Sequence, residues 1–161
     1  MEIYILRHAI AEDRRAGRPD EERALTEQGR RKLRPVLERA RAAGVSPSLI
    51  LTSPYVRAVQ TAEIAGEVLG YKRSIVQTGA LIPGALPQAA WREIRERSGE
   101  EAILLAGHEP LLSALAGYLL GDSELSIDFK KGALLRLDVD ASQREPQGTL
   151  QWLLTPKLAA G

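Results

Sequence analysis

The chain has 161 residues, 44% of them hydrophobic and 27% charged, and its 22 basic and 21 acidic residues give a formal net charge of +1. This length suits one domain with a substantial core, and we expect a single domain over residues 1–161. The balanced charge gives no reason to expect nucleic acid or an anionic membrane as a partner. The chain has no cysteine, which excludes disulfides, thiolate metal sites and any mechanism with a cysteine nucleophile.

The N-terminal residues do not resemble a targeting segment. An apolar run in residues 1–10 reaches Arg7 and His8 too soon for a signal peptide. No apolar stretch approaches the roughly 20 residues that cross a bilayer. We therefore expect a cytoplasmic protein that does not associate with membranes, and the sequence leaves its oligomeric state open.

The first half of the chain alternates strands and helices. Residues 3–6 form a short apolar run typical of a buried strand, and residues 9–25 are charged and irregular, as in a loop. Thr26 is suited to cap a helix that ends near Gly44, with Pro35 at a position that would allow a kink. The pattern then predicts a strand over 49–51, a helix over 55–69 and a strand over 74–77.

The second half continues this alternation. A loop rich in glycine and proline (79–87) is followed by a helix over 88–98, an apolar strand over 102–106 and a helix over 111–120. Two late strands, 133–139 and 149–154, flank a turn and are expected to pair as a hairpin. We predict an α/β fold: a three-layer αβα domain whose sheet is mostly parallel, with a late antiparallel hairpin.

The chain contains only two histidines. His8 follows the first predicted strand, and His108 follows the most apolar one. In a parallel sheet both strands end at the same edge, where active sites gather. Two unrelated histidines, one in a loop and one at a helix cap, would be the simpler explanation, but their matching positions favour a shared site.

Two arginines are expected at the same edge. Arg7 precedes His8 directly, and Arg57 lies one turn into the helix after the second strand. Two guanidiniums and two imidazoles repel one another unless an anion is present, and guanidinium groups bind phosphate oxygens in bidentate fashion. Ser53 at the end of the second strand could donate a further hydrogen bond. We therefore predict a phosphate pocket formed by Arg7, Arg57, His108 and Ser53.

A phosphate pocket without cysteine needs another nucleophile or a metal. Histidines flanked by arginines would oppose a divalent cation, so we expect no metal and no cofactor. Histidine itself can attack phosphorus and form a covalent intermediate. Neighbouring cations would keep its imidazole neutral. The sequence thus favours phosphoryl transfer at one of the two histidines.

Three segments resemble the histidine phosphatase (phosphoglycerate mutase-like) superfamily. Residues 6–9 (Leu-Arg-His-Ala) resemble its Arg-His-Gly signature, residues 52–62 its second-arginine segment, and residues 107–110 (Gly-His-Glu-Pro) its second-histidine motif. Within that superfamily the chain is most similar to the small SixA-type phosphohistidine phosphatases, in its compact length, in residues 107–113 and in residues 131–133. The resemblance implies that His8 is the nucleophile and that Arg7, Arg57 and His108 form the phosphate pocket.

The chain departs from the superfamily pattern at two places. Ala9 replaces the usual glycine, which raises the question of whether the backbone can still approach a phosphate. Mutases and ester phosphatases of the superfamily also carry an acid after the third strand, whereas the loop 79–87 here has no Asp or Glu. Glu12, Asp13 or Glu109 could replace that acid, or each could be a solvated loop residue.

The missing acid favours phosphohistidine as substrate. A protonated P–N bond releases neutral imidazole and needs less help than an alkyl ester. No inserted cap domain is apparent that would enclose a small metabolite, which suits a phosphoprotein partner. A small phosphorylated substrate is the first alternative, and a module that binds a phosphoprotein without turning it over is the second.

Overall fold

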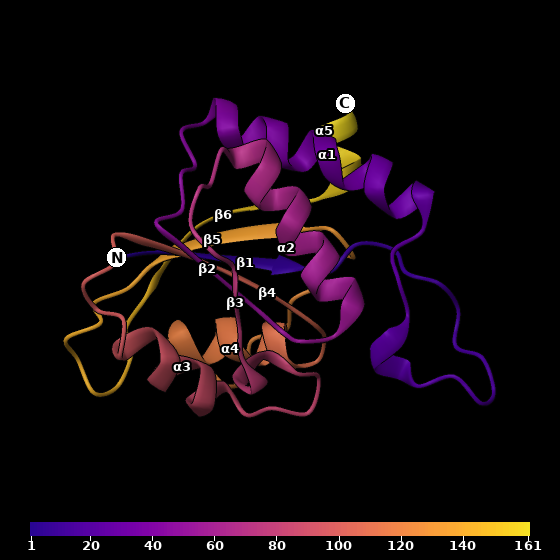
Figure 1. Ribbon diagram of the computed structural model, residues 1–161. Coiled ribbons are helices and arrows are strands. Elements are labelled where there is room, and N and C mark those ends of the chain that lie inside the picture. Colours follow the sequence, from indigo (N-terminus) through magenta and orange to yellow (C-terminus); the bar gives the residue numbers. More distant parts are fainter.

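The computed structural model describes all residues from Met1 to Gly161 as one six-stranded sheet between two layers of helices (Figure 1). The strands lie in the order β3-β2-β4-β1-β5-β6. The first four are parallel to one another, whereas β5 is antiparallel to both β1 and β6. The predicted αβα fold with a late hairpin is thereby confirmed. The strands are β1 (Glu2–Arg7), β2 (Leu49–Thr52), β3 (Val76–Gln77), β4 (Ala102–Gly107), β5 (Leu134–Asp138) and β6 (Thr149–Leu154).

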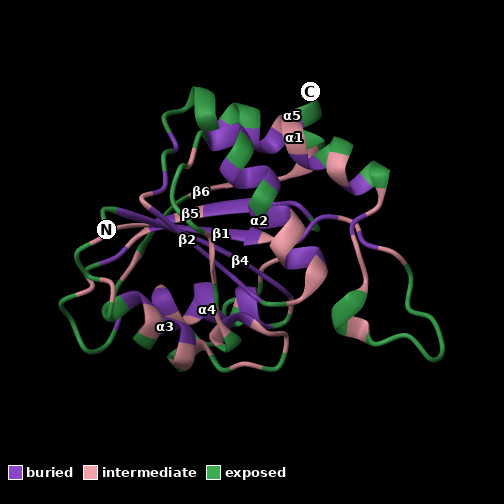
Figure 2. Cartoon of the chain, viewed as in Figure 1, coloured by how far each residue is buried: buried purple, intermediate pink, exposed green.

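The helices cover both faces of the sheet. Helices α1 (Glu27–Ala42), α2 (Val56–Leu69) and α5 (Pro156–Ala160) lie on one face, and α3 (Pro87–Arg95) and α4 (Leu111–Leu119) on the other (Figure 1). Figure 2 shows that the helices bury the side toward the sheet and expose the other. The core is therefore split in two by the sheet, with 21 buried residues on the first face and 20 on the second.

The first turn of α1 is fixed by local chemistry. The Thr26 hydroxyl accepts a hydrogen bond from the Gly29 amide at 3.0 Å, which confirms the predicted cap. A Cβ atom on Gly29 would lie 2.2 Å from the Ile10 carbonyl oxygen, so only glycine allows this close approach to the loop. The helix continues through Pro35 as one element.

Two elements differ from the sequence prediction. The third strand is confined to Val76 and Gln77, because it lies at the sheet edge and only these residues pair with β2. Helix α5 was not predicted, since its five residues are too few for a periodic pattern. No helix is both long and apolar enough to cross a membrane.

The loop between β1 and α1 is irregular, as expected, but it is closed at its base. Ala11 forms an isolated antiparallel bridge with Leu25, and the only helical segment between them is the 3₁₀ turn Asp20–Glu22. The Leu25 amide also donates to Gln60 Oε1 of α2 at 2.8 Å. Figure 1 shows this loop extending outward from the carboxyl end of β1.

Candidate active site

The predicted site residues meet at the carboxyl edge of the parallel strands. Arg7 is the last residue of β1 and pairs in register with Gly107, the last residue of β4, so His8 and His108 leave neighbouring strands side by side. Ser53 follows β2, the other neighbour of β4. The two imidazole ring centres lie 5.1 Å apart. The expectation of a shared site for the two histidines therefore agrees with the geometry.

His8 is almost fully buried and held in one tautomer. Its Nδ1 atom lies 2.7 Å from the Ala9 carbonyl oxygen, which can only accept, so Nδ1 carries the proton. The other ring nitrogen, Nε2, then presents a lone pair. Burial, together with the charges of Arg57, Arg7 and Lys131, lowers the pKa of His8 to about 4, against the opposing hydrogen bond to Ala9. His8 is a neutral imidazole at pH 7 and has the state that a nucleophile needs.

His108 is also buried and neutral. Its Nε2 atom lies 2.8 Å from Ser53 Oγ, and the ring of Tyr55 packs edge-on against it with ring centres 5.1 Å apart. Burial, followed by the charges of His8 and Arg57, lowers the pKa of His108 to about 3. The structure thus places the Ser53 hydroxyl on His108, while a direct role of Ser53 toward phosphate stays a prediction.

The two arginines are each anchored through terminal nitrogens of the guanidinium group. The Arg7 Nη1 atom donates a hydrogen bond to the Phe129 carbonyl oxygen at 2.6 Å. Arg57 donates to the Asp20 carbonyl oxygen at 2.8 Å and to its carboxylate at 3.1 Å, and stacks over the ring of Tyr55. The Nε atoms of both arginines are buried without a partner. Each guanidinium therefore keeps a donor whose hydrogen bond is not made within the chain.

Asp20 is the site residue that the sequence did not indicate. Its carboxylate contacts Arg57 and also accepts from Arg23 at 2.8 Å. Burial opposes its ionisation, but the hydrogen bond from Arg23 and the charges of Arg57 and Arg23 lower the pKa of Asp20 overall. Asp20 lies in an irregular loop without periodicity or a recognisable motif, so only the fold brings it to Arg57.

Two of the three acids proposed from the sequence, Glu12 and Glu109, are engaged by other groups. The Glu12 carboxylate pairs with Arg18 at 3.1 Å, and that of Glu109 accepts from the amide and hydroxyl of Ser113 in α4. Asp13 is exposed and makes no side-chain hydrogen bond or ion pair. Asp20, which does reach the site, is held ionised by arginines. Glu12, Glu109 and Asp20 therefore each have fixed partners, and Asp13 is the one of these four carboxylates without a partner.

Ala9 fits the position that glycine usually occupies. No residue other than glycine has a positive φ, so the backbone at Ala9 has an ordinary conformation. Its amide donates to Thr61 Oγ1 at 3.1 Å, and that hydroxyl donates to the Arg57 carbonyl oxygen at 2.7 Å. Thr61 thus ties the segment after His8 to the first turn of α2. No group of three or more His, Cys, Asp or Glu side chains is arranged to hold a metal ion.

The pKa values of the histidines give the first testable prediction. The chain has only two histidines, so proton NMR can follow both rings, and the His8→Ala variant assigns them. We expect both rings to stay neutral from pH 7 down to about pH 5, because their pKa values of about 4 and about 3 lie far below the usual 6.5. A titration midpoint near 6.5 for either ring would contradict the buried, cation-flanked geometry.

The comparisons with known proteins identify the family. Residues 3–82 match the model of the histidine phosphatase superfamily, branch 1. The chain belongs to this superfamily, whose members are phosphatases with a histidine nucleophile. An uncharacterised protein of Picosynechococcus is 35% identical, with 98% of each chain covered.

Two further comparisons point to one group within the superfamily. The phosphohistidine phosphatase SixA of Escherichia coli K12 is 28% identical over 97% of this chain and 94% of that protein. A solved structure of the protein histidine phosphatase SixA complexed with tungstate superposes with a TM-score of 0.87, at 26% identity and with 98% of each chain covered. The chain is thus a SixA-like phosphatase at low sequence identity.

Proposed function

We propose that this phosphatase hydrolyses phosphohistidine on proteins through a covalent intermediate on His8. The observation that carries the proposal is the state of His8: a buried, neutral imidazole whose proton is fixed on Nδ1 by the Ala9 carbonyl oxygen, 2.7 Å away. The ring centre of His108 lies 5.1 Å from that of His8, and the Nε atoms of Arg7 and Arg57 have no hydrogen-bond partner. This combination suits attack on an anionic phosphoryl group.

The reaction takes place in two displacements. In the first, His8 Nε2 forms a bond to phosphorus while the bond from phosphorus to the substrate imidazole breaks. The electron pair of that bond leaves with the substrate ring, which departs neutral because it is already protonated on its other nitrogen. In the second, water attacks phosphorus, the electron pair of the bond to His8 returns to Nε2, and phosphate leaves with the protons of the water, one of which it gives up to solvent. Arg7, Arg57 and His108 stabilise the charge on the equatorial oxygens in both steps.

The choice of phosphohistidine follows from the carboxylates around the site. Asp20 is held ionised by arginines, and Glu12 and Glu109 are engaged by Arg18 and Ser113. A substrate that brings its own proton on the leaving group is therefore preferred over an alkyl ester. The low-identity similarity to SixA, whose solved structure contains tungstate, supports both the substrate class and a pocket for a tetrahedral oxyanion.

The dependence of rate on the leaving group tests the proposal. The chain would be assayed with a phosphohistidine protein, with aryl phosphates of graded leaving-group pKa and with alkyl phosphates. We expect efficient cleavage of phosphohistidine, a steep loss of kcat/KM as the aryl leaving group becomes more basic, and poor cleavage of alkyl phosphates. The steep dependence arises because an alkoxide would leave with its full charge when no acid protonates it.

Two results would contradict the proposal. A flat dependence on leaving-group pKa, lost in one of the variants Glu12→Gln, Asp13→Asn or Glu109→Gln, would identify a general acid and point to a small phosphoester as substrate. Binding of phosphohistidine protein without release of phosphate, even in a single turnover, would point to a binding module. Steep dependence unchanged in all three amide variants supports the P–N substrate.

A further inference from the structure

A hollow of about 630 Å³ beside the catalytic pocket concentrates positive charge. Five of its eight lining residues are cationic and none is acidic. These cations come from the end of β1, from α1, from the segment before β5 and from α5. We call this hollow the basic pocket, and its cationic residues are Arg7, Lys32, Lys130, Lys131 and Lys157.

The basic pocket and the catalytic pocket share one rim. Arg7 lines the basic pocket and immediately precedes His8. The Gly132 amide donates to the carbonyl oxygens of both Arg7 and His8 at 3.1 Å, which holds the segment that carries Lys131 against them. The charge of Lys131 accordingly contributes to the lowered pKa of His8. A molecule that places a phosphoryl group at His8 therefore lies next to these lysines.

Most of these lysines have no carboxylate partner. Lys130 pairs with Asp128 at 2.8 Å, whereas Lys32, Lys131 and Lys157 form no ion pair within the chain. Cations that converge on one hollow repel one another, and a bound anion relieves this repulsion. The pocket thus favours a negatively charged occupant.

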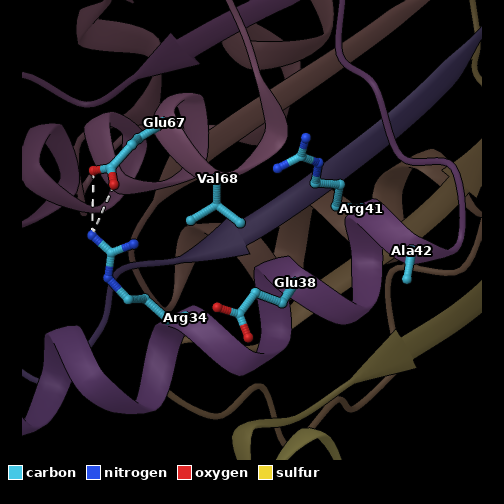
Figure 3. A pocket seen from close by; sticks show the side chains of 6 residues that line it. All are labelled: Arg34, Glu38, Arg41, Ala42, Glu67 and Val68. Carbon is cyan, nitrogen blue, oxygen red and sulfur yellow. Dashed lines mark hydrogen bonds and ion pairs between the residues drawn. The ribbon is translucent and has the colours of Figure 1, made fainter.

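Another hollow on α1 shows that this charge is a local feature. A cavity of about 570 Å³ between α1 and α2 is lined by two arginines and two glutamates (Figure 3). Figure 3 shows Arg34 and Glu67 paired across it, and their closest atoms lie 3.2 Å apart. The whole chain has a formal net charge of only +1. The excess of cations in the basic pocket therefore means that basic residues gather there while the acidic residues lie elsewhere.

The positive surface continues away from the catalytic pocket. An adjoining hollow of about 530 Å³ shares Lys32, Pro156 and Lys157 with the basic pocket, adds Arg31, and also lacks an acidic residue. The cations therefore extend along the junction of α1 and α5. The two hollows together are larger than the contact area of one anionic group on a small molecule. A segment of a protein with several carboxylates could contact both hollows.

We propose that the basic pocket binds an acidic segment of the phosphorylated protein, with carboxylates of that segment beside the phosphohistidine. The inference rests on the proposed function, because it assigns the second contact of the same substrate. Lysine ammonium groups on flexible stems attract carboxylates without demanding one geometry. Such contacts at the rim of an interface act through electrostatic complementarity and select among partners.

Two synthetic phosphohistidine peptides test this proposal. They are identical except that glutamates flank the phosphohistidine in one and glutamines in the other. The double variant Lys32→Glu/Lys157→Glu reverses two charges of the basic pocket. Its matched control, Arg41→Glu/Lys72→Glu, makes the same change in net charge at exposed residues outside that pocket. Hydrolysis of an aryl phosphate, which carries no carboxylate for the basic pocket to bind, reports phosphoryl transfer without the proposed docking contact.

We expect wild type and the control to prefer the glutamate peptide by about tenfold in kcat/KM, through KM, which is the scale of two exposed ion pairs. This preference should shrink with added salt and disappear in Lys32→Glu/Lys157→Glu, whose aryl phosphatase activity should match wild type. Equal use of both peptides by wild type, or a preference that survives in this variant, would overturn the proposal.

The same peptides separate this proposal from the proposed function. If wild type cleaves the aryl phosphate but neither peptide, the phosphohistidine assignment is wrong. Inhibition of aryl phosphate hydrolysis by each peptide then decides the present proposal. Stronger inhibition by the glutamate peptide, lost in Lys32→Glu/Lys157→Glu, supports the acidic docking contact, and equal inhibition by the two peptides refutes it.

Discussion

Replacement of His8 by alanine is expected to abolish turnover together with any acid-labile phosphoenzyme. His8 has a fixed tautomer with a free Nε2, and the neighbouring His108 ring has its Nε2 engaged by Ser53. The test is a rapid acid-free quench of the enzyme with a radiolabelled phosphoryl donor, followed by digestion and mapping of the label. The wild-type label is expected on the peptide that contains His8.

A second variant, His8→Gln, keeps a polar side chain of similar length. Its amide nitrogen is not nucleophilic, so this variant should not form a phosphoenzyme either. Because His8 directly follows β1 and is buried, circular dichroism and thermal melting would be used to verify that both variants fold. A wild-type label mapped to any residue other than His8 would refute the mechanism.

Replacement of Arg57 by alanine is expected to reduce kcat/KM by a factor of more than 100, which corresponds to about 3 kcal/mol or more of transition-state stabilisation. Arg57 is 3% exposed and brings a preorganised guanidinium to the pocket. His108→Ala should be comparably severe. The measurement is kcat/KM on phosphohistidine protein and on an activated aryl phosphate, and both should fall.

The contact between Arg57 and Asp20 provides the control for this result. If the role of Arg57 were only to hold the loop between β1 and α1, Asp20→Ala would lower kcat/KM as much as Arg57→Ala. Asp20→Ala removes the carboxylate that lies 3.1 Å from the Arg57 guanidinium. We expect Asp20→Ala to cost far less, since Arg57 keeps its bond to the Asp20 backbone oxygen at 2.8 Å. Near-wild-type rates in both Arg57→Ala and His108→Ala would refute the shared phosphate pocket.

Local sequence patterns were enough to predict the positions of some site residues, whereas the positions of others depend on the tertiary fold. His8 and His108 each follow an apolar run, and the rule that parallel strands end at one edge was sufficient to bring them together. Asp20 reaches Arg57 across 37 residues through an irregular loop, so no local pattern predicts the contact. The contact of Ser53 with His108, across 55 residues, likewise depends on which strands are neighbours.

The limits of the secondary-structure prediction have similar causes. The third strand is shorter than the predicted range 74–77, because pairing at the sheet edge involves only Val76 and Gln77. Helix α5 is stabilised by its packing against α1, where Arg39 Nε donates a hydrogen bond to the Ala159 carbonyl oxygen at 2.8 Å. Such a tertiary contact has no counterpart in sequence periodicity.

The closure of the loop between β1 and α1 has a consequence for how this enzyme could diversify. Because Ala11 pairs with Leu25, the chain leaves and re-enters the domain at one point, and the residues between form a separable module. Doubling the length of such a module costs only about 0.6 kcal/mol of closure entropy. A chimaera that carries the corresponding segment of a relative can therefore exchange this module without rebuilding the sheet, provided that the new segment again offers Arg57 a backbone carbonyl oxygen as acceptor.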